Sequence, residues 1–207
     1  HAATHRRRVH SRRGRDLHGL VMDRLTRITC FWHFRIAMPL WSMVRNLAYL
    51  YANKHRLATA RAQKAAIERK MREDYAHPVW AAINPLGYAV AGAFLGFSYR
   101  EDDGGDWRQW VLTSLISGGG DCEDFATLGK WALETLGFKA RIVWLLQTDG
   151  NGSHAIAMTD DGHWVIRGTR TIDLWEYATN NHEPDMRKAL LDFMGAEYYA
   201  VYGTGWK

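Results

Sequence analysis

The second half of the chain shows a helical pattern followed by strand patterns. An apolar series at helical spacing follows Cys122, and Gly137 marks its predicted end. The next segment is apolar on both faces, as in a buried strand, and two shorter segments follow the turn sequences DGNG and DDG. A short helix from Pro184 to Gly195 closes the pattern. A helix followed by antiparallel strands predicts an α+β domain. The predicted strands are 139–149, 153–159 and 163–169.

The segment 17–52 is apolar but interrupted. Arg35 and Arg45 break every run long enough to span a bilayer, and Pro39 breaks or kinks a helix. The pattern predicts two amphipathic helices with arginines on the solvated face. A helix that lies on a membrane surface is the alternative interpretation.

Two further helical segments are predicted before residue 100. Residues 54–76 consist of strong helix formers with few apolar positions, which favours an exposed connecting helix over a dedicated binding helix. Residues 79–99 contain no charged side chain and are long enough for a membrane span. Asn84-Pro85 and the glycines that follow favour instead a short buried helix over roughly 87–97.

Charge divides the chain unevenly. Residues 1–77 carry 17 Lys and Arg against 5 Asp and Glu, about +12, whereas residues 78–207 carry 10 against 17, about −7. We therefore expect a basic, mainly helical N-terminal extension over 1–77 and a separate domain over 78–207. Because arginine binds phosphate in a bidentate manner, the extension predicts RNA, DNA or a large assembly as partner. The candidate anion-binding residues are Arg6, Arg7, Arg8, Arg12, Arg13 and Arg15.

The first 15 residues contain six arginines and no acidic residue. No apolar run follows them directly, so they do not resemble a secretory signal peptide. Their composition is compatible with an organellar transit peptide, and also with a disordered basic tail.

The two cysteines lie far apart in different contexts, so we expect free thiols rather than a disulfide or a zinc pair. Cys30 lies within the apolar segment 17–52, whereas Cys122 begins the predicted helix after three glycines. The helix dipole lowers a thiol pKa there, but the flanking Asp121 and Glu123 raise it. The thiol therefore needs a nearby cation. His154, at the start of a predicted strand, is the candidate for a thiolate–imidazolium pair.

The motif region resembles the bacterial transglutaminase-like cysteine peptidases of the papain-like superfamily. The resemblance is carried by "GDCEDFATLGKWALETLGFKARIV", by "SHAIAM" and "GHWVI", and by the upstream "FSYREDDGGDWRQWVLTSLISGG", over about residues 80–175. It implies a papain/transglutaminase-like core in which a Cys-bearing helix packs on an antiparallel sheet. It also implies Cys122 as nucleophile, His154 as general base, and an oxyanion hole at the Cys122 N–H near Trp107.

The same resemblance implies that Asp121 and Glu123 bind calcium, whose preferred ligands are carboxylate oxygens. Capping of the helix N-terminus is the alternative role for these acids. No other cofactor is implied.

One residue departs from the family pattern. The resemblance implies an acid on the strand after the histidine, but Arg167-Gly168 occupies that position. An arginine near His154 would disfavour the imidazolium. The nearest acids lie in a turn or too late in the chain, at Asp160, Asp161 and Asp173.

The sequence therefore supports two functions. The first is a transglutaminase-like cysteine hydrolase, a peptidase or amidase acting on a peptide or protein. The alternative is a catalytically inactive scaffold in a large assembly, which binds nucleic acid or another anionic surface through its Arg-rich N-terminus. Contact of residues 28–52 with a membrane surface is a third interpretation.

Overall fold

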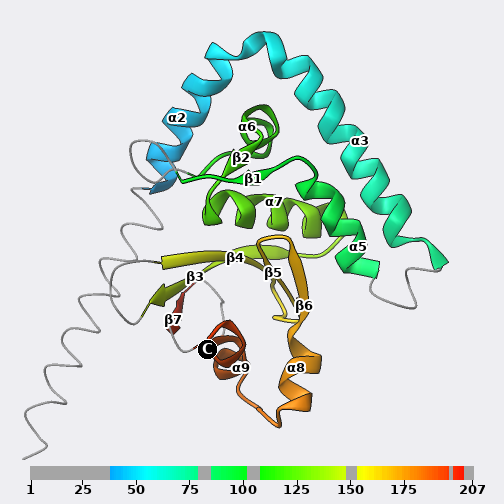
Figure 1. Ribbon diagram of the computed structural model, residues 1–207, viewed down its shortest axis with the longest axis vertical. Helices are drawn as coiled ribbons and strands as arrows, with labels where there is room; N and C mark the ends of the chain where they lie inside the picture. Colours follow the sequence, from blue (N-terminus) through cyan, green and yellow to red (C-terminus); the bar gives the residue numbers. More distant parts are fainter. Residues whose placement is uncertain (1–37, 79–84, 102–107, 148–152, 196–197, 203–207) are drawn as a thin grey trace, which may run out of the picture. The chain divides into compact units, whose positions relative to one another are not determined.

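The computed structural model describes residues 38–78, 85–101, 108–147, 153–195 and 198–202 (Figure 1). Contacts divide the chain into two compact units, residues 1–41 and residues 42–207. The second unit holds every described strand and helix except the first four residues of α2 (Met38–Ala52). The expected separation of a basic extension over 1–77 from a domain over 78–207 stays a prediction.

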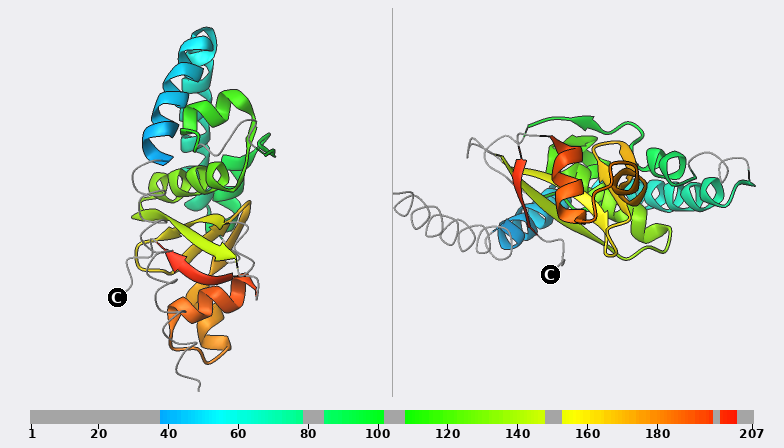
Figure 2. Two further views of the ribbon diagram at one scale, coloured as in Figure 1. Left: turned by 90° about the vertical axis from the view of Figure 1, so that its left-hand side faces the viewer. Right: turned by 90° about the horizontal axis from the view of Figure 1, so that it is seen from below.

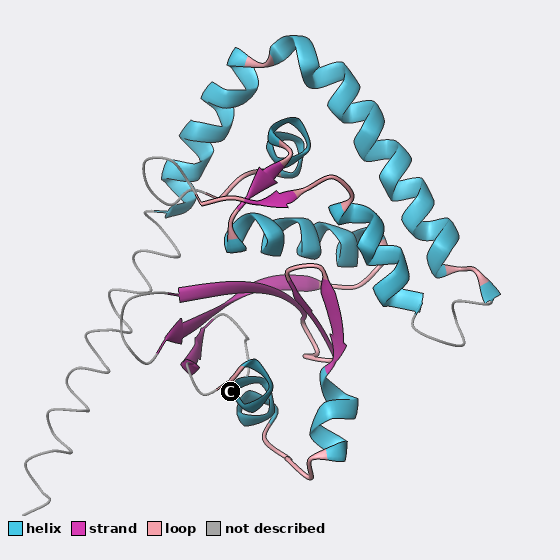
Figure 3. Cartoon of the chain, in the orientation of Figure 1, coloured by secondary structure: helices cyan, strands magenta, loops and turns pink. Residues whose placement is uncertain are grey.

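A five-stranded antiparallel sheet with the order β6-β5-β4-β3-β7 forms the centre of the second unit (Figure 3). The three predicted strands are confirmed, because each contains one strand of this sheet. No sequence pattern predicts the two edge strands, β6 and β7. The bounds are β3 Ala140–Gln147, β4 Ser153–Thr159, β5 Trp164–Arg167, β6 Arg170–Asp173 and β7 Tyr198–Tyr202.

Helices cover both faces of the sheet. The cysteine-bearing helix α7 lies across one face, and α8 and α9 lie against the other (Figures 1 and 2). This arrangement confirms the predicted α+β class with a Cys-bearing helix packed on an antiparallel sheet. The bounds are α7 Cys122–Thr135, α8 Leu174–Asn180 and α9 Met186–Met194.

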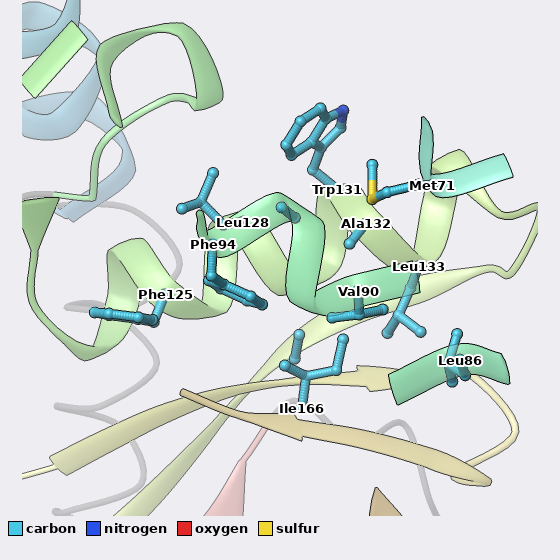
Figure 4. Packing of buried hydrophobic residues seen from close by; sticks show 12 residues of the cluster. Met71, Leu86, Val90, Phe94, Phe125, Leu128, Trp131, Ala132, Leu133 and Ile166 are labelled. Carbon is cyan, nitrogen blue, oxygen red and sulfur yellow. The ribbon is translucent and has the colours of Figure 1, made fainter. Parts of the chain in front are cut away.

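Alternate side chains of β4 and β5 enter different hydrophobic cores. Ala157 and Ile166 face α7 and join the core shown in Figure 4. A Cβ at Gly129 of α7 would lie only 3.1 Å from both of them, so the glycine allows the helix to pack closely on the sheet. Ile156 and Met158 point the other way, into the core with α8 and α9.

The described residues before 77 are helical, as expected: α2, η2 (Lys54–Arg56) and α3 (Leu57–Tyr75). Pro39 lies in the first turn of α2, where a missing N–H breaks no helical hydrogen bond. Residues 54–76 form the expected helix and most of them are exposed, but one face packs on the core, so α3 is more than a connecting helix. Met71 of α3 is fully buried at 0% exposure, and the Trp131 indole of α7 donates to Glu68 at 2.9 Å.

The helix expected near 87–97 consists of α5 (Pro85–Ala91) and η3 (Gly92–Phe94), with Leu86 and Val90 buried. Among the described residues, no helix has the length and apolar character needed to cross a membrane. Before α7, the chain forms α6 (Val111–Ser117) and a parallel two-stranded ladder of β1 (Ser98–Tyr99) and β2 (Gly119–Gly120).

Replacing Met71 by Ala tests whether α3 belongs to the core. We expect the free energy of unfolding to fall by about 2–5 kcal/mol, because the change leaves a cavity between α3, α5 and α7. Met43→Ala is the matched control, since Met43 is 42% exposed, and it should change stability by less than about 0.5 kcal/mol. Urea unfolding measures both, and equal effects would show that α3 does not contribute to the core.

Candidate active site around Cys122

Three consecutive glycines, Gly118 to Gly120, precede the site, and each is required for a different steric or conformational reason. Gly118 ends α6 in the left-handed region, with φ +70°. A Cβ at Gly119 would lie 2.8 Å from the Ser98 carbonyl oxygen. A Cβ at Gly120 would lie 1.9 Å from a carboxylate oxygen of Asp124, so only glycine fits there.

The Asp124 carboxylate is fully buried and holds the entrance to α7 in place. It accepts hydrogen bonds from the Gln109 backbone N–H at 2.6 Å and from the Gln109 side-chain amide at 2.7 Å. It also accepts from the Asp121 N–H at 3.3 Å, while Asp121 caps the helix by accepting from Glu123 N–H at 3.2 Å. The alternative role of helix capping is therefore confirmed for Asp121, and Asp124 completes a capping box.

A buried asparagine of α2 supports this entrance from behind. Asn46 donates to the Arg108 carbonyl at 2.8 Å and accepts from the Trp110 N–H at 2.7 Å and the Thr113 hydroxyl at 2.6 Å. Arg108 and Trp110 flank Gln109, so Asn46 fixes the backbone that presents Gln109 to Asp124. Sequence reasoning missed both Asn46 and Gln109, because the partners that define their roles are distant: Asp124 lies 15 residues from Gln109, and the segment bonded by Asn46 lies 62 to 67 residues away.

The Cys122 thiol lies at the N-terminus of α7, against β4. Its Sγ donates to Glu123 Oε2 at 3.1 Å, and it accepts a hydrogen bond from the backbone of Ala155. Burial raises the pKa of Cys122 far above its usual range, and the charge of Glu123 raises it further. The Ala155 hydrogen bond lowers the pKa but does not offset these effects. The thiol is therefore protonated at neutral pH.

The second predicted catalytic residue, His154, precedes Ala155 in β4. Strand alternation places its side chain on the face of Ile156 and Met158, where its ring lies 6.1 Å from that of Tyr198. Its Nε2 is buried without a hydrogen-bond partner. The fold thus brings Cys122 to the backbone beside His154, but no hydrogen bond between the described atoms joins the thiol to the imidazole.

Burial lowers the pKa of His154 to about 4, and the nearby Arg167 guanidinium contributes to the shift. This confirms the expectation that an arginine at this position disfavours the imidazolium. Arg167 also donates to the Met194 carbonyl of α9 at 3.4 Å. His154 is therefore neutral at pH 7.

None of the three nearby acids considered from the sequence orients His154. Asp160 pairs with Arg141 at 2.7 Å, and Asp161 accepts from Thr159 at 2.5 Å. Asp173 accepts from the Glu176 N–H at the start of α8 and pairs with a different imidazole, that of His163, at 3.1 Å. Each acid is thus engaged elsewhere.

The acids beside Cys122 form a candidate cation site. Ligand atoms of Asp121, Cys122 and Glu123 lie within 4.8 Å of one another, and both carboxylates are buried at 8% and 4% exposure. The oxygen atoms of these two buried carboxylates are ligands that calcium prefers. Calcium takes six to eight oxygen ligands, and these residues supply only part of that number. The Arg108 guanidinium interacts with Glu123 and Asp124 and compensates part of their charge.

Tyr99 of β1 is a further residue at the site. Tyr99 is 63% exposed, but partial burial raises the pKa of its phenol, and the charges of Cys122 and Asp121 add to the shift. Its ring stacks on Phe125 of α7 at 6.3 Å. A phenol O–H near a thiol is a candidate hydrogen-bond donor to an oxyanion.

Several predicted residues lie outside the part of the chain that the structure describes. Their roles in the oxyanion hole, in anion binding or as a free thiol stay predictions. These residues are Trp107, Cys30, Arg6, Arg7, Arg8, Arg12, Arg13 and Arg15.

Comparison with known proteins gives limited information. No family model matches the chain, and no curated protein matches it. Among solved structures, calcium-bound LapG of Legionella pneumophila is similar, with 19% sequence identity and a TM-score of 0.42 over 61% of this chain and 71% of LapG. At this level of similarity the transglutaminase-like family stays a prediction from the sequence motif.

Replacing Glu123 by Gln should lower the pKa of Cys122, because it removes the charge that most strongly disfavours the thiolate. At a fixed pH below that pKa, alkylation of Cys122 should then become at least about tenfold faster, which corresponds to one pKa unit. Mass spectrometry of iodoacetamide adducts measures this rate, with Cys30 as internal reference.

Glu134→Gln is the matched control, because Glu134 lies at the other end of α7 and pairs with Lys130. It should leave the rate unchanged. Equal rates in wild type and Glu123→Gln would contradict the assigned cause of the pKa shift.

Replacing Arg167 by Gln should raise the pKa of His154 from about 4 toward its ordinary value, because the change removes a positive charge beside the imidazole. NMR titration of the His154 ring, identified by its loss in His154→Gln, measures the shift. Arg170→Gln is the control. Arg170 is the register partner of Arg167 on the neighbouring strand β6, but its side chain is exposed to solvent, so its removal should leave the His154 pKa unchanged. An unchanged His154 pKa in Arg167→Gln would contradict the assignment.

Proposed function

We propose that residues 42–207 form a transglutaminase-like thiol hydrolase, a peptidase or amidase, whose nucleophile is Cys122. The observation that carries the proposal is the position of the thiol. It stands at a helix N-terminus and accepts a hydrogen bond from Ala155, the residue next to His154. Helix α7 thereby brings the thiol to the backbone of β4, the strand that carries the candidate base, although Cys122 and His154 lie far apart in the chain.

We assign the catalytic steps to residues of the chain as follows. Cys122 attacks the substrate carbonyl carbon, its S–H bond breaks, and a thioester forms as the amine leaves with a proton. His154 is the proposed carrier of that proton, and the Cys122 N–H with the Tyr99 phenol are the proposed donors to the oxyanion. Water then hydrolyses the thioester and restores the thiol.

Calcium held by Asp121 and Glu123 would offset the carboxylate charges that raise the pKa of Cys122. The described arrangement without such an ion favours a protonated thiol and a neutral imidazole. The hydrolase proposed here is therefore cation-dependent, and the carboxylates act as its control element.

A second candidate function has its own support. Arg167 lies beside His154 and no described carboxylate orients that ring, so proton transfer from Cys122 to His154 is strongly unfavourable. These features favour an inactive scaffold. In that case, binding of nucleic acid or another anionic surface by the Arg-rich N-terminus would be the function.

Trapping of an acyl-enzyme tests the hydrolase directly. We expect the full-length protein to form a covalent adduct at Cys122 with an activated peptide thioester in calcium but not in EGTA. Intact-mass spectrometry detects the adduct. Cys122→Ser should abolish it, and His154→Gln should slow its formation by about 100-fold, the size of a typical general-base contribution.

Asn181→Ala, a change at the exposed end of α8 remote from α7, should leave adduct formation unchanged. Adduct formation that is independent of calcium would contradict the control element but not the nucleophile. No adduct under either condition, in a protein that remains folded, would favour the inactive scaffold.

A further inference from the structure

Helix α2 turns its polar residues inward and its apolar residues outward. Ser42 and Asn46 are buried, at 3% and 0% exposure, and hydrogen-bond to the segment around Arg108. The opposite side of the helix carries an exposed apolar surface, which we name the α2 face. The α2 face consists of Met43 (42% exposed), Val44 (54%), Leu47 (54%) and Tyr51 (76%).

The exposed apolar side chains of the α2 face form a continuous stripe and are not scattered over the helix. Val44, Leu47 and Tyr51 lie three and four residues apart, which places their side chains on one side of a helix. Each of the four side chains of the α2 face is at least 42% exposed. A contiguous apolar surface of this kind marks an interaction site.

The charged side chains of the sequence stretch that contains α2 are all basic. From residue 38 to residue 67 the chain contains five Lys and Arg residues and no Asp or Glu. Lys54 lies with its Nζ 5.4 Å from the centre of the Tyr51 ring, so a cation borders the face directly. The other basic residues of this stretch are Arg45, Arg56, Arg61 and Lys64.

We propose that the α2 face docks on an anionic membrane surface. An exposed apolar stripe that ends in an aromatic residue with a lysine beside it matches a helix that lies in the lipid interface. Its apolar side chains enter the boundary with the acyl chains, and Lys54 and its neighbours contact the anionic headgroups.

Other occupants fit the observations less well. A second copy of the chain would place the same cations opposite one another, which is unfavourable without acidic partners. Nucleic acid would pair with the cations but leave Val44 and Leu47 without apolar contacts. An anionic lipid surface satisfies both the apolar stripe and its basic border.

Vesicle binding by the full-length protein tests the proposal. Vesicles of phosphatidylcholine and phosphatidylglycerol are sedimented at about 0.5 M salt, where the Debye length falls to about 4 Å and charge contacts of the Arg-rich N-terminus are screened. We expect Leu47→Gln to lower the partition coefficient about tenfold, because it removes one exposed leucine from the lipid contact. Binding to pure phosphatidylcholine should be weaker than to the mixed vesicles at about 0.1 M salt.

Leu95→Gln is the matched control, since Leu95 is 80% exposed but lies outside α2, and it should leave binding unchanged. Val44→Gln with Tyr51→Gln is a second variant and should reproduce the loss. Circular dichroism checks that each variant is folded. Equal binding of Leu47→Gln and wild type would overturn the proposal. So would light scattering that shows a dimer which Leu47→Gln dissociates, because the occupant would then be a second copy.

Discussion

The buried carboxylate of Asp124 is the interaction on which the arrangement of the site depends. It gathers two N–H groups of Gln109 and the N–H of Asp121, and so joins the segment before α6 to the first turn of α7. A buried carboxylate that lost these donors would be strongly destabilised. The requirement for glycine at 120 follows from the same contact, because the carboxylate occupies the space of a Cβ. Asn46 extends this support to α2, whose residues from Ser42 onward belong to the same compact unit as the site.

The chemistry of Cys122 is a balance between its position and its neighbours. A helix N-terminus and a backbone donor favour the thiolate, whereas burial and Glu123 favour the thiol. On the strand beside it, burial and Arg167 keep His154 neutral. Without an added cation, both groups therefore rest in their uncharged forms. This balance is why cation binding at Asp121 and Glu123 is central to the proposed hydrolase and why its absence would favour the scaffold.

The sequence predicted features that arise from local signals. The Asp121 cap, the end of α7 near Gly137 and the tight turn after Thr159 involve residues only a few positions apart, and all are present. The core role of α3 was missed because Ala60, Ile67 and Met71 form a sparse pattern whose meaning depends on the helices packed against it. Pairing of β7 with β3 and the contacts of Asn46 join distant segments, so no local pattern reveals them. Cys122 and His154 were identified from the motif, but the face on which the His154 side chain lies follows only from the strand register.

The pKa of Cys122, measured from the pH dependence of its alkylation in calcium and again in EGTA, tests the central claim most directly. The account predicts a pKa well above that of an ordinary thiol, about 8.5, in EGTA and a clear decrease in calcium that Asp121→Asn removes. An identical pKa under both conditions would contradict a cation-controlled nucleophile. A low pKa in EGTA would contradict the assignment of burial and Glu123 as the groups that hold the proton on the thiol.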